Sequence, residues 1–216
     1  MAKKISSLYT NLMKPLDIIN IHEIDPSIKV RLSYATEDNF TGLIIPGYKS
    51  INKAYLIREA ALALSQIQKK LASFGLELFI FDAYRPQKAV NFFHHWGKDE
   101  TAPGLKNKFF PNLTKQEIFD QEFIAKKSRH NRASAVDLSL MEKDSGLLLD
   151  MGTIFDFFGE ESHTAYPRLT SSQQKNRQFL LEIMQEAHFE NFPKEWWHFN
   201  FHLDPYYNQV LDFDIS

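Results

Sequence analysis

Apolar residues recur at helical spacing in two long segments of the chain. Residues 52–74 place apolar side chains on one face of a helix, and Gly75 follows as a residue suited to the left-handed end of a helix. Residues 171–187 show the same spacing after Ser171 or Ser172, either of which can cap a helix. The apolar residues that we expect to face a core are Leu56, Ala60, Leu64, Ile67, Leu71 and Phe74 in the first segment, and Leu180, Ile183, Met184 and Ala187 in the second.

Two shorter helices are predicted in the middle of the chain. Pro86 suits the first position of one, which ends near Gly97, because its fixed φ matches a helix and its missing N–H is not needed there. Thr114 and Glu117 form a capping box that opens the other, which is expected to run to about residue 127. Their expected buried residues are Ala89, Val90, Phe93 and Trp96, and Ile118, Phe119, Phe123 and Ile124.

Alternation of apolar and polar residues predicts the strands of the fold. They are expected at residues 30–36, 76–81, 136–140 and 196–201, with a further short strand around residues 17–24. Residues 101–112 are rich in Pro, Gly and Lys, so we expect a surface loop there. Residues 1–15 carry little periodic signal and are expected to include a mobile end.

Composition narrows the class of protein. A length of 216 residues suits one domain over residues 1–216, and the 19 Phe and 3 Trp suit a compact core and rigid pocket walls. The absence of cysteine excludes disulfides and thiolate zinc sites, so any metal must be held by nitrogen and oxygen atoms.

Charge and hydropathy exclude several partners. A net charge of −2, with no lysine cluster larger than a pair, argues against nucleic-acid binding. No segment approaches the ~20 apolar residues of a membrane span, and the N-terminus lacks the apolar run of a signal peptide. We therefore expect a cytoplasmic protein, or a periplasmic one if a leader is removed before residue 1. The sequence leaves the oligomeric state open.

Two short segments carry the residues of a metal-dependent active site: Ser-Arg-His-Asn-Arg-Ala-Ser-Ala-Val-Asp at residues 128–137 and Glu-Trp-Trp-His at residues 195–198. His130, Asp137 and His198 can supply three ligands to a zinc ion and leave a position open for water, beside which Glu195 can act as general base. A strand would put His130 and Asp137 on opposite faces, so the chain between them must fold back. Spacing alone also allows these to be ordinary polar residues of the core or surface.

Three other residues are candidates for a site. Arg85, in Asp-Ala-Tyr-Arg-Pro at residues 82–86, is held extended by the following proline at a strand end, where it either faces a cleft or pairs with Asp82 at the surface. Tyr34 either faces a site or is a half-buried strand aromatic. Asp156 lies between two phenylalanines, an unusual place for a charge.

His94 and His95 are adjacent, so on a helix they point about 100° apart and cannot share one metal ion. We expect them to be solvent or packing histidines.

Together with Tyr-Ala-Thr-Glu-Asp-Asn-Phe-Thr-Gly at residues 34–42, these motifs resemble the D-alanyl-D-alanine dipeptidases, the VanX-type branch of the zinc D,D-peptidases. The resemblance covers about residues 20–205, with the motifs in the same order and at similar separations. It implies an α+β fold with helices around a central, mainly antiparallel sheet. It also implies one Zn²⁺ ion per chain and hydrolysis of the free dipeptide D-Ala-D-Ala to D-alanine.

The resemblance assigns a role to each candidate residue. It implies that Glu195 is the catalytic base and that Arg85 stabilises the oxyanion of the tetrahedral intermediate. It implies that Asp156 holds the free ammonium of the dipeptide. The implied zinc ligands are His130, Asp137 and His198, and the residues implied to line the small substrate pocket are Tyr34 and Ser128.

The chain departs from the family pattern at Ala133, where the family usually has glycine. If this position needs a positive φ, alanine costs on the order of 1 kcal/mol and could shift the loop that carries His130, with weaker zinc binding or turnover.

Two other functions remain open at the level of sequence. One is a zinc D,D- or L,D-carboxypeptidase that trims peptidoglycan stem peptides with the same metal site in a more open pocket. The other is a non-catalytic binding module whose zinc ion only stabilises the fold; the presence of Glu195 and Arg85 argues against it. The sequence does not distinguish a role in antibiotic resistance from wall recycling or nutrient use.

Overall fold

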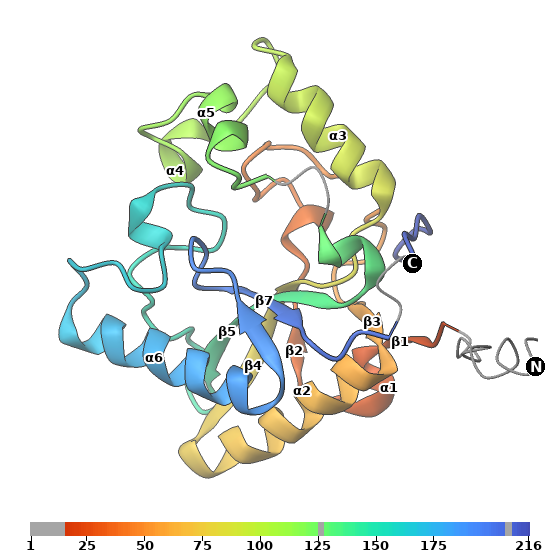
Figure 1. Cartoon of the computed structure of the whole chain (residues 1–216), viewed down its shortest axis with the longest axis vertical. Helices are drawn as coiled ribbons and strands as arrows, with labels where there is room; N and C mark the ends of the chain where they lie inside the picture. Colours follow the sequence, from red (N-terminus) through yellow and green to blue (C-terminus); the bar gives the residue numbers. More distant parts are fainter. Residues whose placement is uncertain (1–15, 125–127, 206–208) are drawn as a thin grey trace, which may run out of the picture.

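The computed structural model describes residues 16–124, 128–205 and 209–216, so the mobile end expected at residues 1–15 lies outside the described residues. At its centre is a five-stranded sheet in the order β2-β4-β5-β7-β6 (Figure 1). Strand β2 is parallel to β4, and the other neighbouring strands of this sheet are antiparallel. The strands are β1 Ile18–Asn20, β2 Lys29–Val30, β3 Tyr55–Ile57, β4 Leu76–Asp82, β5 Ala135–Glu142, β6 Phe189–Asn191 and β7 His198–Phe201. The α+β class with a mainly antiparallel sheet is confirmed.

Helices cover the sheet on two sides. Helix α2 packs along β4 and α6 packs along β6, and both lie below the sheet in Figure 1. Helices α3, α4 and α5 are grouped at the top of the same view. The helices are α1 Ile21–Ile24, α2 Arg58–Leu71, α3 Gln87–Lys98, α4 Lys106–Phe109, α5 Lys115–Asp120 and α6 Ser171–Glu186, with 3₁₀ turns η1 Ser33–Ala35, η2 Ala72–Phe74, η3 Arg129–Arg132 and η4 Glu160–Ser162.

The register of the central strands brings three polar residues together at one end of the sheet. Asp137 in β5 lies opposite Asp82 in β4 on one side and opposite His198 in β7 on the other. A register shift between Ile80 and Asp82 acts as a bulge, so that Asp82 and not Phe81 stands opposite Asp137. This end of the sheet becomes the floor of the candidate site.

The helix predicted at residues 52–74 begins later than expected. Residues Tyr55–Ile57 form β3 and pair with β1, so Leu56 is buried from a strand and not from a helix. At the other end the chain tightens into the 3₁₀ turn η2, which rotates Phe74 off the apolar stripe and leaves it 62% exposed. Gly75 has φ +68, which confirms its left-handed conformation at the helix end.

The prediction of a strand at residues 30–36 is wrong beyond its first residue. Strand β2 is only Lys29–Val30, and after Arg31 donates to the carbonyl of Ile80 the chain leaves the sheet. Leu32 donates instead to the carbonyl of Ile51, and η1 follows. The 3₁₀ turn, not a strand, therefore carries Tyr34.

The helix predicted to run from Thr114 to about residue 127 is shorter than expected. Its capping box is present, but α5 ends at Asp120. Glu122 adopts φ +66, and Phe123 donates to the carbonyl of Ile118, so the chain turns inward and buries Phe123. The remainder of the prediction, residues 125–127, lies outside the described residues.

Other differences concern element ends and one loop. The short strand expected around residues 17–24 divides into β1 and α1, because the Asn20 side chain caps a helical turn. Thr170, not Ser171 or Ser172, caps α6. The expected surface loop at residues 101–112 contains α4, and Phe109 and Phe110 within it are buried.

The remaining strand and helix predictions hold with small shifts. Strand β4 extends one residue beyond the expected 76–81, and β5 extends the expected 136–140 at both ends. The last strand starts at His198 and not at residue 196. Pro86 is the N-cap of α3, one position before the expected place. In the described part of the chain, no helix is long and apolar enough to cross a membrane.

Candidate metal and catalytic site

His130, Asp137 and His198 converge at the end of the sheet. Asp137 Oδ1 lies 3.3 Å from His130 Nε2 and 2.9 Å from His198 Nδ1, and the two imidazole nitrogens are 3.1 Å apart. These atoms lie within 4.8 Å of one another, and no other such group is found among the described residues. The arrangement provides two nitrogen donors and one carboxylate aimed at one point.

A tight local path allows His130 to reach Asp137. Ser128 accepts a hydrogen bond from the His130 backbone N–H and caps the 3₁₀ turn η3. Ala133 then reverses the chain at φ +54 and ψ +29 before β5 begins. The fold-back that the spacing of His130 and Asp137 requires is therefore made by one left-handed residue.

Acceptors behind the two imidazoles fix their orientation. His130 Nδ1 lies 2.5 Å from the carbonyl oxygen of Ala83, which can only accept, so Nδ1 carries the proton and Nε2 is free. His198 Nε2 lies 3.2 Å from Asn200 Oδ1, which leaves Nδ1 free in the same way. Outer acceptors of this kind are a regular feature of metal-binding histidines. The donor set fits zinc, which takes imidazole nitrogen and carboxylate oxygen.

Glu195 stands beside the triad without belonging to it. The His198 N–H donates to the Glu195 carbonyl at 3.2 Å, and this turn at the entrance of β7 brings the Glu195 carboxylate to 3.9 Å from His198 Nδ1. Burial raises the pKa of Glu195 well above its usual range, and the negative charges of Asp137 and Asp156 make a smaller contribution in the same direction. The carboxyl group is therefore poised to exchange a proton with a group bound in the cavity.

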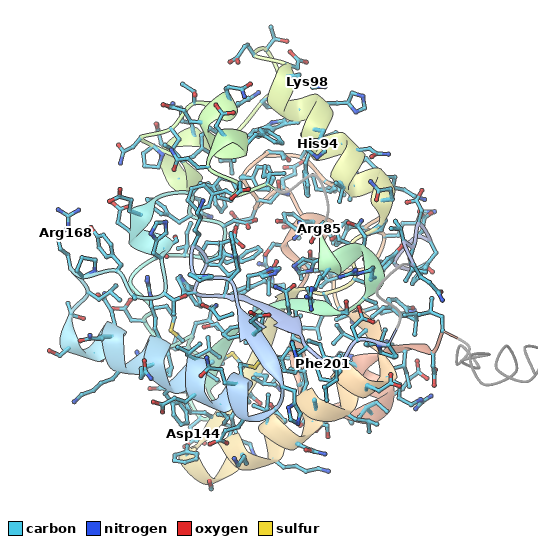
Figure 2. The ribbon with its side chains drawn as sticks, in the orientation of Figure 1. Arg85, His94, Lys98, Asp144, Arg168 and Phe201 are labelled. Atoms are coloured by element: carbon cyan, nitrogen blue, oxygen red, sulfur yellow. The ribbon has the colours of Figure 1, made fainter. Side chains whose placement is uncertain are left out.

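Arg85 lies inside the molecule between α3 and the sheet (Figure 2). Its Nε donates to Asp82 Oδ2 at 2.9 Å, and its Nη2 lies 3.3 Å from Asp137 Oδ2. Its guanidinium stacks over the ring of Tyr34 at 5.0 Å. The pairing with Asp82 that the sequence left open is present, but the side chain is only 14% exposed, so Arg85 is not a surface residue.

Tyr34 and Asp156 form a buried pair on the same cavity. The Tyr34 hydroxyl donates to Asp156 Oδ2 at 2.8 Å. Asp156 is 5% exposed and has φ +61, a conformation that aspartate tolerates better than most residues. Burial raises the pKa of Asp156 well above its usual range, and the negative charge of Asp137 makes a smaller contribution in the same direction. A buried carboxyl with so little compensation suits a cationic ligand.

One cavity of about 300 Å³ unites these groups. All of the candidate residues line it: Tyr34, Arg85, Ser128, His130, Asp137, Asp156, Glu195 and His198. Aromatic walls to which the sequence analysis gave no role in the site complete it, among them Phe40, Phe123, Phe158 and Phe192. Phe158 and Phe192 belong to none of the motifs, so local sequence gave no signal for them. His94 and His95, by contrast, lie on α3 away from this lining, and His94 packs against Phe119.

Asn200 is the one functional residue that local sequence could have indicated. It lies two residues after His198 in β7, and residues two apart in a strand share a face. Its contact with the outer nitrogen of His198 was not predicted. The Ala83 carbonyl had no sequence signal, because a backbone acceptor is independent of side-chain type.

Comparison with known proteins identifies relatives along most of the chain. A family model described as D-Ala-D-Ala dipeptidase matches residues 14–216. D-alanyl-D-alanine dipeptidase of Enterococcus faecium is 36% identical over 91% of this chain and 96% of its own length. The enzyme of the same name from Streptomyces coelicolor is 32% identical over 93% of this chain and 98% of its own.

A weaker likeness exists among solved structures. A mutant of the vancomycin-resistance D,D-pentapeptidase VanY, in complex with Zn(II), matches 69% of this chain and 74% of its own with 12% identity and a TM-score of 0.42, too low to carry an argument. The family match and the dipeptidase relatives decide the assignment: the chain is a peptidase and belongs to the D-Ala-D-Ala dipeptidase family.

Proposed function

We propose that the chain is a zinc-dependent dipeptidase that hydrolyses D-Ala-D-Ala to two molecules of D-alanine. The observation that carries this proposal is the joining, in one cavity of about 300 Å³, of a ligand triad, a separate buried carboxyl beside it and a second buried carboxyl paired with a tyrosine. Family membership supports the substrate.

His130 Nε2, Asp137 and His198 Nδ1 would hold the zinc ion. When bound, zinc supplies Lewis-acid polarisation of the peptide carbonyl and lowers the pKa of water to about 7. The Ala83 carbonyl and the Asn200 side chain keep the two ligand nitrogens deprotonated and directed inward.

Glu195 is proposed as the general base. It accepts a proton from the attacking water and passes it to the nitrogen of the leaving D-alanine, so that one water is consumed and one C–N bond breaks. A positioned base contributes about 10²–10⁴-fold to such a reaction. The burial that raises the pKa of Glu195 makes its carboxylate a stronger proton acceptor than an exposed glutamate.

Arg85 is proposed to stabilise the negative charge that develops on the carbonyl oxygen. Its anchoring on Asp82 and its contact with Asp137 fix the guanidinium before substrate binds, and preorganised donors stabilise a transition state more than mobile ones.

Asp156 is proposed to bind the free ammonium of the dipeptide, with Tyr34 holding one of its oxygens and Ser128 on the cavity wall. A substrate without that ammonium leaves a buried carboxyl uncompensated, which disfavours N-blocked and longer peptides. The cavity volume of about 300 Å³ likewise favours a dipeptidase over a carboxypeptidase that acts on peptidoglycan stem peptides in a more open pocket.

The test is alanine release from D-Ala-D-Ala, L-Ala-L-Ala and N-acetyl-D-Ala-D-Ala by zinc-loaded protein, with Glu195→Ala as control. Hydrolysis confined to the free D,D-dipeptide, and lost in the variant, is the expected result. Hydrolysis of a muropeptide pentapeptide but not of D-Ala-D-Ala would favour the carboxypeptidase. If the folded, zinc-bound protein hydrolyses none of these substrates, the non-catalytic binding module is the remaining function.

A further inference from the structure

A second cavity, of about 480 Å³, lies on the same face of the central sheet as the candidate site. Ser139 in β5 lines it, and Ser139 is two residues after Asp137, so both side chains leave the strand on one face. Phe79, the partner of Ser139 in β4, lines it too. Its volume falls in the range of roughly 300–1,000 Å³ that small-molecule sites occupy.

A wall of aromatic side chains divides the two cavities. Phe155 lines the second cavity, whereas the next residue, Asp156, lines the first. Trp196 and its neighbour Trp197 are divided in the same way. Phe155 is stacked on Phe81 with ring centroids 4.7 Å apart and planes 9° from parallel. The second cavity is therefore a separate space that shares a wall with the first.

Ser139 presents an unsatisfied hydroxyl to this second cavity. The residue is 1% exposed, and its Oγ has no hydrogen-bond partner among the residues that the structure describes. Thr153, another hydroxyl of the lining, accepts from Trp196 Nε1 at 2.8 Å and is satisfied. Buried polar atoms without a partner are rare in native proteins. We therefore expect an atom of a bound ligand to form the missing hydrogen bond with the Ser139 hydroxyl.

The charged side chains that line the second cavity are Arg31, Lys108, Asp38 and Asp150, and their formal charges cancel. The carboxylate of Asp38 is paired with Lys108, and that of Asp150 accepts from the Gly152 backbone and the Gln173 side chain. Arg31 also lines the cavity, and it forms no ion pair in residues 16–124, 128–205 and 209–216.

The rim of the same cavity is apolar. Leu148 is 43% exposed and Ile154 is 44% exposed, and both lie in its lining. An exposed apolar rim around a pocket marks a binding surface.

We propose that the second cavity binds a small apolar carboxylate with one further hydrogen-bonding atom. The carboxylate pairs with Arg31, the apolar body packs on Phe79, Phe109 and Met151, and the further polar atom reaches Ser139 Oγ. This site is separate from the proposed hydrolysis and does not depend on it.

The probe for the test is 3-(4-hydroxyphenyl)propionate, with the uncharged 3-(4-hydroxyphenyl)propan-1-ol as its matched control. The full chain is labelled with [methyl-¹³C]methionine and titrated with each compound by NMR. The chain has 5 methionines. Met151 lines the second cavity, whereas Met184 is fully buried and is absent from that lining, so it serves as an internal control.

The expected result is a saturable shift of the Met151 signal, none of the Met184 signal, and about fivefold tighter binding of the acid than of the alcohol. Arg31→Gln should abolish that preference, whereas Arg168→Gln, at an exposed arginine that stacks on Tyr166, should retain it. Ser139→Leu, which fills the cavity, should weaken both compounds.

Two results would overturn the proposal. One is a Met151 signal that does not move at millimolar acid. The other is equal affinity for acid and alcohol in the unmodified chain. Because no turnover is measured, either result leaves the dipeptidase proposal untouched.

Discussion

The ligand triad (His130, Asp137 and His198) and the Tyr34–Asp156 pair line one cavity but are built in different ways. Asp137 and His198 are register partners in adjacent strands, so backbone hydrogen bonds place them. The pair joins residues 122 positions apart, from a 3₁₀ turn and from an irregular segment with a positive φ. The two triad members in the sheet, Asp137 and His198, should therefore withstand changes outside it, whereas the pair should depend on contacts that hold its segment in place.

The largest loss of activity is expected from a change at Glu195, which lies beside the ligand triad. Glu195→Gln should lower kcat on D-Ala-D-Ala by about 10²–10⁴-fold, because glutamine cannot accept the proton of the attacking water. Zinc content should remain one per chain, because the three proposed ligands are unchanged. Steady-state D-alanine release and metal analysis of the same sample measure the two quantities. Loss of zinc in this variant would mean that Glu195 is a ligand and not the base.

The next effect tests what holds the Tyr34–Asp156 pair. Arg177 on α6 is 2% exposed and donates to the carbonyls of Met151, Glu161 and His163, which flank the segment containing Asp156. Arg177→Leu leaves these acceptors unpaired and should lower the free energy of unfolding by about 3 kcal/mol.

The Arg177→Leu variant should also raise KM more than it lowers kcat, with zinc content unchanged, if the pair depends on its segment and the triad does not. Urea denaturation, kinetics and metal analysis give the three values. Arg168→Leu is the matched control, since that arginine is exposed. A parallel loss of zinc in Arg177→Leu would show that the two parts of the cavity are not independent.

A smaller effect is expected at the pair itself. Asp156→Asn keeps the shape of the side chain and tolerates the positive φ, but it removes the charge proposed to bind the ammonium. We expect kcat/KM on D-Ala-D-Ala to fall about 10–100-fold, and discrimination between the free and the N-acetylated dipeptide to fall with it. Asp150→Asn, at an exposed aspartate of the same segment, should leave both values unchanged. Unchanged discrimination between the free and the N-acetylated dipeptide would falsify the ammonium-binding role.

The smallest effect concerns the loop that carries His130. Ala133 has φ +54, so the condition under which alanine costs stability is met. Ala133→Gly should raise the free energy of unfolding by about 1 kcal/mol, because glycine adopts this conformation without strain. Ala135→Gly, in β5, should lower it by about 0.5–1 kcal/mol. Thermal unfolding compares the two variants, and a destabilised Ala133→Gly protein would show that the alanine methyl packs more favourably than its strain costs.

Prediction from sequence succeeded where a side chain and its local spacing carry the information. The capping box at Thr114, the glycine at position 75 and the apolar face of α6 are of this kind. It failed where a distant partner competes with the local preference. Tyr55–Ile57 continues a helical pattern but pairs with β1, and residues after Arg31 alternate like a strand but leave β4.

The sequence by itself determined which residues can bind a metal, exchange a proton or carry a charge, because these are properties of side chains. It also determined the family, through motifs kept in order along the chain. Tertiary structure alone decided that Asp82 and not Phe81 faces Asp137, and that the Ala83 carbonyl orients His130. Strand register, a bulge and a backbone acceptor leave no mark on residue type, since every residue offers the same backbone groups.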